Sequence, residues 1–85
     1  MTNPRKVLGA ILGGTSDANV GFDDLRRVLG ALGFGERIKG DHHIFWRDGV
    51  VEIINLQPRP DGKAKTYQVR QVRQLVTRYH LELER

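Results

Sequence analysis

The dipeptide Asp48-Gly49 constrains the fold of this chain more than any other feature. It separates two apolar runs, HHIFWR at 42–47 and VVEIINL at 50–56, and both are rich in β-branched and aromatic residues. An Asp-Gly pair between such runs is a strong β-hairpin signal, because glycine tolerates the positive φ of tight turns. Residues 36–39 precede the hairpin as a short edge strand. We therefore predict a three-stranded antiparallel meander.

Apolar residues recur at helical spacing in three further segments, residues 5–13, 22–33 and 66–80. Thr66 is the predicted N-cap of the last helix. Its polar side chains are expected to face away from the core, namely Gln68, Arg70, Gln71, Arg73 and Gln74. The polar residues 15–19 are predicted as a loop. The order helix, helix, three strands, helix predicts one α+β domain over residues 1–85, with the helices on one face of the sheet.

The charge balance favours an anionic partner. Fourteen Lys and Arg residues against ten Asp and Glu residues give a net charge of +4. Between residues 63 and 78 the chain carries only basic charges, those of Lys63, Lys65, Arg70, Arg73 and Arg78. These residues fit contacts to RNA phosphates and equally fit a solvated helix face, so both interpretations stay open.

The absence of cysteine bounds the chemistry of the chain. It excludes disulfides, thiolate metal sites and a cysteine nucleophile. The apolar stretch VLGAILGG at 7–14 is too short to span a membrane, and no cleavage pattern of an export signal follows it. We expect a cytoplasmic protein that makes no membrane contact.

His42 and His43 open the second predicted strand. Successive strand residues face opposite sides of a sheet, so the two imidazoles have different roles. The plain alternative is that one histidine packs or caps a loop while the other is an ordinary surface residue. Only Asp41 and Glu52 accompany the pair as metal ligands, so we expect no metal site. A serine triad is disfavoured, because Ser16 is the only serine and lies in a predicted loop.

A histidine that acts as general acid or base on RNA needs fewer catalytic groups than a metal site or a serine triad. RNA supplies its own nucleophile, the 2′-OH, so the protein has only to move protons and hold the phosphate. Gly40 allows close approach of the backbone, and the candidate cations are Lys39, Arg47, Lys63 and Lys65.

Four stretches together resemble the HicA toxin family of bacterial toxin–antitoxin systems, in its YcfA-like branch. They are IKGDHHIF at 38–45, the Asp-Gly hairpin, EIINLQP at 52–58 and GKAKTYQVRQVRQLV at 62–76. The resemblance runs from Phe22 to Tyr79, roughly two-thirds of the chain, and keeps the family's order.

The resemblance implies a double-stranded-RNA-binding-domain-like fold, and a ribonuclease that cuts mRNA without metal or organic cofactor. It also implies a HicB-type antitoxin that covers the active site. The family's Gly-Ser-His motif corresponds to Gly40, Asp41 and His42, which makes His42 the catalytic histidine and Gly40 the turn that positions it. Some members place the histidine one residue later, so His43 is the alternate or orienter. The RNA-binding set comprises Lys39, Gly40, Arg47, Lys63, Lys65, Arg70 and Arg73.

The chain departs from the family at two places. Asp41 stands where the family usually has serine, which puts a negative charge that repels phosphate beside the histidine. This keeps a second function open, a catalytically weak module of the same fold that binds RNA or the antitoxin. A helical extension at about residues 4–20 precedes the part that resembles the family. It covers an apolar edge, mediates homo-oligomerisation or docks a partner, and the sequence leaves these roles open.

Three further residues carry alternatives. Trp46 and Tyr67 either stack on RNA bases or pack among apolar neighbours. His80, near the end of the last predicted helix, is interpreted as a cation that interacts favourably with the helix C-terminus.

Overall fold

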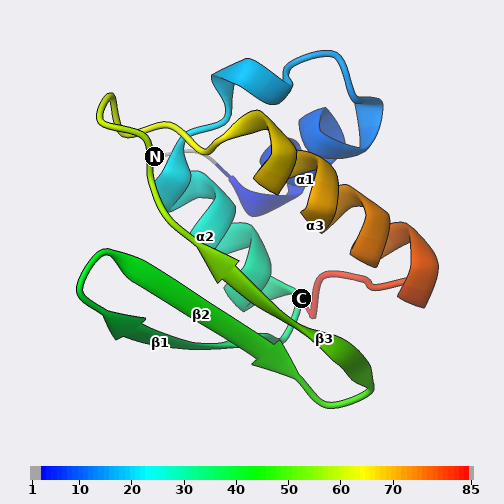
Figure 1. Ribbon diagram of the computed structural model, residues 1–85. Coiled ribbons are helices and arrows are strands. Elements are labelled where there is room, and N and C mark those ends of the chain that lie inside the picture. The colour runs from blue at the N-terminus through cyan, green and yellow to red at the C-terminus, as the bar shows by residue number, and fades with distance from the viewer. Residues whose placement is uncertain (1–2, 85) are drawn as a thin grey trace.

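The computed structural model describes residues 3–84, and within that range it contains three α-helices, one short 3-10 helix and three strands (Figure 1). In chain order the elements are α1 (Pro4–Gly13), η1 (Asp17–Asn19), α2 (Phe22–Ala31), β1 (Gly35–Lys39), β2 (His42–Arg47), β3 (Val50–Leu56) and α3 (Thr66–Tyr79). The predicted α+β layout, α-α-β-β-β-α, is confirmed. The short helix η1 lies in the segment that was predicted as a loop.

The sheet has the strand order β1-β2-β3, with both pairs antiparallel. Gly40 and Gly49 supply positive φ angles of 62° and 87° at the two hairpin turns. A bulge interrupts the second pair, because Phe45 lies opposite Ile54 whereas Arg47 lies opposite Val50. Figure 1 shows all the helices on one side of the sheet. The other side, which we call the open face, is covered by no helix among residues 3–84.

The core lies between the helices and the inner face of the sheet. Phe45, Ile54 and Leu56 project inward from the sheet and are almost fully buried. The helices meet them with apolar side chains that include Leu25, Val28, Leu29, Val69 and Val72. Burial of side chains of this kind contributes about 1.5–3 kcal/mol each relative to exposure, so this layer dominates the stability of the fold.

Helix α1 belongs to the same core. Asn3 caps it, since the Asn3 side chain accepts a hydrogen bond from the Arg5 backbone N–H at 2.8 Å. Val7 and Ile11 are buried against the rest of the cluster, while Leu12 on the outer side is 46% exposed. Of the three roles considered for the N-terminal extension, covering apolar surface is therefore the one its packing performs. None of the helices within residues 3–84 combines the length and apolar character needed to cross a membrane.

Helix α3 begins differently from the prediction. Its N-cap is Lys65, so the assignment of Thr66 as the cap is wrong. The outward orientation predicted for Gln68 is also wrong, because its side chain is fully buried. The reason is local: the Gln68 side-chain oxygen accepts a hydrogen bond from the Lys65 backbone N–H at 3.3 Å, which turns the amide back along the helix.

Arg73 also fails to face solvent as predicted. Its guanidinium donates to both carboxylate oxygens of Asp17, at 2.9 and 3.1 Å, and to the Ile11 carbonyl at 2.9 Å. The pair is mostly shielded from solvent. Arg73 therefore ties α3 to η1 and α1, and the hydrogen bond from Arg73 lowers the pKa of the Asp17 carboxyl.

Candidate functional site

The β1–β2 turn presents His42 on the open face. Lys39 and His42 are the last residues paired across this hairpin, so only Gly40 and Asp41 form the turn. Positive φ at the first position of a two-residue turn belongs to type II′, which glycine adopts without strain. Phe45 points into the core, and alternation therefore sends His42 outward and His43 inward.

The imidazole of His42 is half exposed and held by the third strand. Its Nδ1 lies 3.2 Å from the Asn55 side-chain oxygen, and its side chain is 51% exposed. A carbonyl oxygen only accepts, so Nδ1–H donates and Nε2 is left with a free lone pair in the neutral ring. Asn55 thus selects the tautomer in which Nε2 is the base.

The carboxylate of Asp41 approaches the other ring nitrogen. Its Oδ1 lies 3.8 Å from His42 Nε2, which is a charge contact and too long for a hydrogen bond. The Gln57 side-chain amide donates to Asp41 Oδ2 at 2.6 Å. That hydrogen bond from Gln57, with smaller contributions that include the charges of His42 and Lys65, lowers the pKa of Asp41. Asp41 is therefore ionised at neutral pH.

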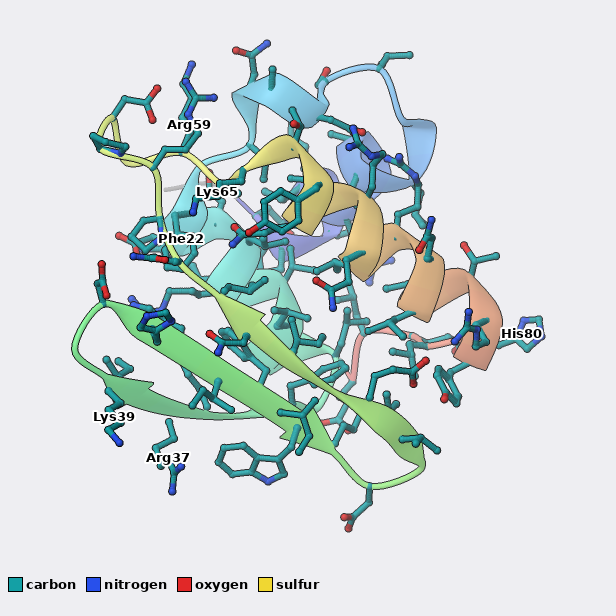
Figure 2. All side chains as sticks on the ribbon, viewed as in Figure 1. Phe22, Arg37, Lys39, Arg59, Lys65 and His80 are labelled. Carbon is teal, nitrogen blue, oxygen red and sulfur yellow. The ribbon has the colours of Figure 1, made fainter. Side chains whose placement is uncertain are left out.

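Two lysines lie near this group. Lys39 is directly opposite His42 in the β1–β2 register and projects from the same face, away from the helices (Figure 2). Lys65, at the N-cap of α3, is close enough to Asp41 to act on its charge. We call the set Lys39, Asp41, His42, Asn55, Gln57 and Lys65 the His42 cluster.

His43 occupies a different environment. Its side chain is 12% exposed, and its Nδ1 lies 2.7 Å from the Glu36 carboxylate. Its ring meets Phe22 edge-on, with centroids 4.9 Å apart. Burial opposes ionisation of Glu36, but hydrogen bonds from Arg26 and His43 outweigh it and lower the Glu36 pKa. The contacts of His43 are those of a packing residue between α2 and the sheet.

Of the remaining cations of the predicted set, Arg47, Lys63 and Arg73 are hydrogen-bonded within the fold and Arg70 is exposed. The Arg47 Nε donates to the Leu32 carbonyl at 2.9 Å, which fixes the far end of β2 to the end of α2. The Lys63 Nζ donates to the Asn19 side chain at 3.2 Å. Arg70 is exposed and acts electrostatically on Asp17, the partner of Arg73. The structure thus brings together Lys39, Gly40, His42 and Lys65, and it places Arg47, Lys63, Arg70 and Arg73 elsewhere.

Asn55 and Gln57 are the functional residues that sequence reasoning missed. Both belong to the stretch EIINLQP, and alternation along β3 places Asn55 on the face of His42. Counting outward from the Asp48-Gly49 turn without the bulge would have set Asn55 opposite His42 and so revealed the pair.

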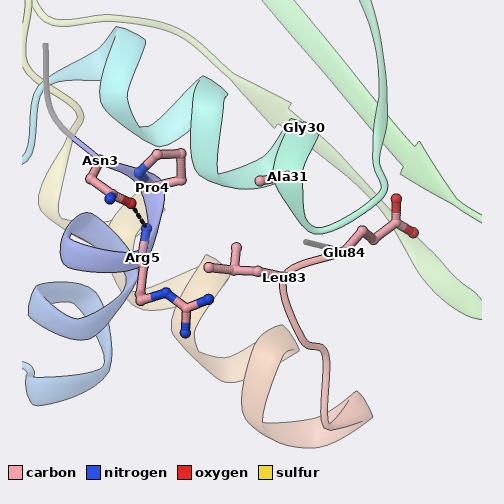
Figure 3. A pocket seen from close by; sticks show the side chains of 7 residues that line it. All are labelled: Asn3, Pro4, Arg5, Gly30, Ala31, Leu83 and Glu84. Atoms are coloured by element: carbon pink, nitrogen blue, oxygen red, sulfur yellow. Dashed lines mark hydrogen bonds between the residues drawn. The ribbon is translucent and has the colours of Figure 1, made fainter.

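A cavity at the other end of the molecule lies away from this cluster. It measures about 420 Å³ and lies between the start of α1, the end of α2 and the C-terminal segment (Figure 3). Its lining offers three polar side chains, those of Asn3, Arg5 and Glu84, and Asn3 is already used as the cap of α1. It contains none of the predicted site residues. Within residues 3–84 no three His, Asp or Glu side chains gather as metal ligands.

Comparisons of the chain with protein-family models, with curated proteins and with solved structures found no match.

Proposed function

We propose that this protein is the toxin of a toxin–antitoxin pair, an endoribonuclease that cleaves mRNA by metal-independent acid–base catalysis with His42. The observation that carries the proposal is the outward, half-exposed His42 ring, whose Nδ1 is bound by Asn55 and whose Nε2 is left without a hydrogen-bond partner beside Asp41. The sequence resemblance to HicA toxins points to the same residue on separate grounds.

In the proposed reaction, His42 Nε2 takes the proton of a ribose 2′-OH. The 2′-oxygen forms a bond to the adjacent phosphorus and the P–O5′ bond breaks. The products are a 2′,3′-cyclic phosphate and a 5′-hydroxyl end, whose proton comes from the imidazolium or from solvent. Lys39 and Lys65 hold the phosphate, and Asn55 keeps Nδ1 protonated throughout.

The proposed partner is a HicB-type antitoxin that covers His42. His42 lies beside a turn at the edge of the sheet, and no helix among residues 3–84 covers its face. A bound protein would therefore have direct access to it. Covering this one turn would block both the base and its phosphate-binding lysines.

The decisive experiment is expression of the intact chain without antitoxin, followed by growth and total mRNA. We expect growth arrest and RNA fragments with 2′,3′-cyclic phosphate ends. His42→Ala should abolish both while the protein remains folded, and a chelator should leave purified activity unchanged. Intact mRNA in arrested cells, or no arrest at all, would refute the nuclease.

One observation favours a second function, a catalytically weak module that binds RNA or antitoxin. The ionised Asp41 lies 3.8 Å from the proposed base and repels an incoming phosphate. Asp41→Ser restores the residue that the family usually has. Under the nuclease proposal this variant should cleave RNA several-fold faster than the parent, mainly through a lower KM. Cleavage by Asp41→Ser alone, with none by the parent, would establish the weak module instead.

A further inference from the structure

The open face of the sheet carries an uncovered apolar area beside the His42 cluster. The open-face side chains are those of Arg37, Lys39, His42, Ile44, Trp46, Val51, Ile53 and Asn55. Trp46 is 46% exposed and Ile53 is 68% exposed. Such large apolar side chains left in water mark a binding surface more often than a structural one.

Trp46 is held in place by what lies beneath it. A Cβ atom at Gly35 would lie only 2.6 Å from Trp46 Cζ2, so the indole rests directly on the Gly35 backbone. Beside it, Arg37, Ile44, Trp46 and Ile53 line a groove of about 300 Å³. The groove therefore has an aromatic wall, an aliphatic floor and a guanidinium, the combination that sandwiches a nucleobase.

The charge of this face selects an anionic occupant. Neither Arg37 nor Lys39 forms an ion pair with any residue between 3 and 84. Both project away from the helices along β1 (Figure 2). The strand residues of the open face include no acidic side chain. A partner protein with an apolar and neutral surface would leave Arg37 and Lys39 without negatively charged partners.

We propose that this groove is a nucleobase site for single-stranded RNA, in which a base stacks on Trp46 against Arg37. The sugar-phosphate backbone of the RNA then runs along β1, past Lys39, to His42. Trp46 and His42 are four residues apart on the same face of β2, about 13 Å at the rise of a strand, which a short run of nucleotides spans. The inference rests on the proposed function and specifies its substrate, because bases within a duplex are not available for stacking.

Trp46 is the only tryptophan, so its fluorescence reports directly on the groove. The probe is a mixed pool of 2′-fluoro single-stranded RNA of about eight nucleotides, which lacks the nucleophile and cannot be cleaved. We expect it to quench the fluorescence on binding, and the same pool as duplex to quench far less. Trp46→Ala lacks this fluorophore, so its binding is followed by the fluorescence anisotropy of a dye-labelled probe, and it should weaken binding roughly tenfold, which is the effect of losing one stacked base.

Three variants keep the test interpretable. Gly35→Ala leaves every cation and the indole present but forces the ring from its seat, so it should weaken binding without removing a binding group. Trp46→Phe should retain most of the affinity. Leu12→Ala is the matched control, because Leu12 is as exposed as Trp46 but lies on α1.

The outcomes separate this site from the nuclease proposal. If His42→Ala still binds the probe and quenches, but the parent never cleaves RNA, the base site stands and the nuclease falls. RNA cleavage with unchanged fluorescence and an unaffected Trp46→Ala variant overturns the base site alone. A Trp46→Ala variant that loses self-association or antitoxin binding, while keeping its RNA affinity, also overturns it and makes the face a protein interface.

Discussion

His42 and His43 share a strand and differ in nearly everything else. The first is held by one hydrogen bond to Asn55 at the edge of solvent, whereas the second is wedged between Phe22 and Glu36. Under the proposed function, loss of the first ring removes the catalytic base, whereas loss of the second removes packing. Two neighbouring positions therefore give separable phenotypes.

His43→Ala is expected to destabilise the fold by about 1–3 kcal/mol, because it removes an edge-on aromatic contact and a charged hydrogen bond. Urea unfolding followed by circular dichroism measures this loss. His42→Ala is the matched control and should leave the unfolding midpoint unchanged. Under conditions where His43→Ala is folded, its RNA cleavage should match that of the parent; complete inactivity of the folded variant would reassign the base to His43.

Asn55→Ala tests the tautomer argument. Without the Asn55 oxygen, the ring no longer keeps its proton on Nδ1, so fewer molecules offer a free Nε2. We expect kcat to fall about tenfold with little change in KM, a smaller loss than that of His42→Ala. A rise in KM with unchanged kcat would mean that Asn55 binds substrate and does not position the imidazole.

At the scale of elements, the contact between Arg73 and Asp17 is the polar link between α3 and the N-terminal helices. Arg73 lowers the pKa of Asp17, so the folded state holds this proton less tightly than the unfolded state. The ion pair therefore contributes fully to the stability of the fold above the pKa of Asp17 in the unfolded chain, about 3.9. This stabilisation is lost as the pH falls through the lower pKa that Asp17 has in the folded state.

Asp17→Asn should therefore be less stable than the parent at neutral pH and should lose less stability on acidification. Urea midpoints at neutral pH and at about pH 3 measure both effects. Asp48→Asn, in the exposed hairpin turn, serves as the control because Asn-Gly forms such turns equally well. Parallel pH curves for the parent and Asp17→Asn would contradict the assigned link.

Element types were predictable from the sequence, and partners across the sheet were not. The periods of 2 and 3.6 residues locate β2, β3 and the helices, because burial of one face imposes them. From Phe45 to Arg47 the second strand advances two residues while the third advances four, from Ile54 back to Val50. A shift of two preserves which face each side chain occupies, so the separation of His42 from His43 and the shared face of His42 and Asn55 were predictable, whereas the diagonal offset between His42 and Asn55 was not.

The orientations of two polar side chains of α3 were also not predictable from the sequence. Hydropathy places Gln68 and Arg73 in water. In the structure Gln68 accepts a hydrogen bond from the Lys65 backbone N–H, and Arg73 donates to Asp17 and to the Ile11 carbonyl. The Gln68 contact is local to the start of the helix, whereas the Arg73 contacts depend on the tertiary arrangement, and neither leaves a periodic trace in the sequence. The same applies to Arg47, whose guanidinium looked free and is bonded to Leu32.

At the scale of the whole molecule, one core extends from α1 to α3, so the N-terminal extension should not unfold separately. Ile11→Ala removes a fully buried side chain and should cost about 2–5 kcal/mol. Far-ultraviolet circular dichroism reports the helices and Trp46 fluorescence reports the sheet, and their transitions should coincide. Leu12→Ala should change little, and a separate early transition in the helical signal would show that α1 is an independent unit.

The positive charges of the molecule divide into those that are paired within the fold and those that are not. The chain has an excess of four positive charges, yet Arg47 and Arg73 are engaged inside the fold, and Arg26, Arg59 and Arg78 face acidic partners. The cations that form no ion pair within residues 3–84 include Arg37 and Lys39 on β1, Lys65 and Arg70 at and beyond the start of α3, and Arg5 and Lys6 on α1.

The opposite facing of the two histidines has a genetic consequence under the proposed function. Cells forced to express this chain without antitoxin would escape by mutation. Escape at codon 42 would leave a full-length protein at normal abundance, because nothing in the core depends on that ring. Escape at codon 43 would instead destabilise the protein, which would then be degraded. Surviving cells would therefore fall into two groups, those that still accumulate the protein and those that do not.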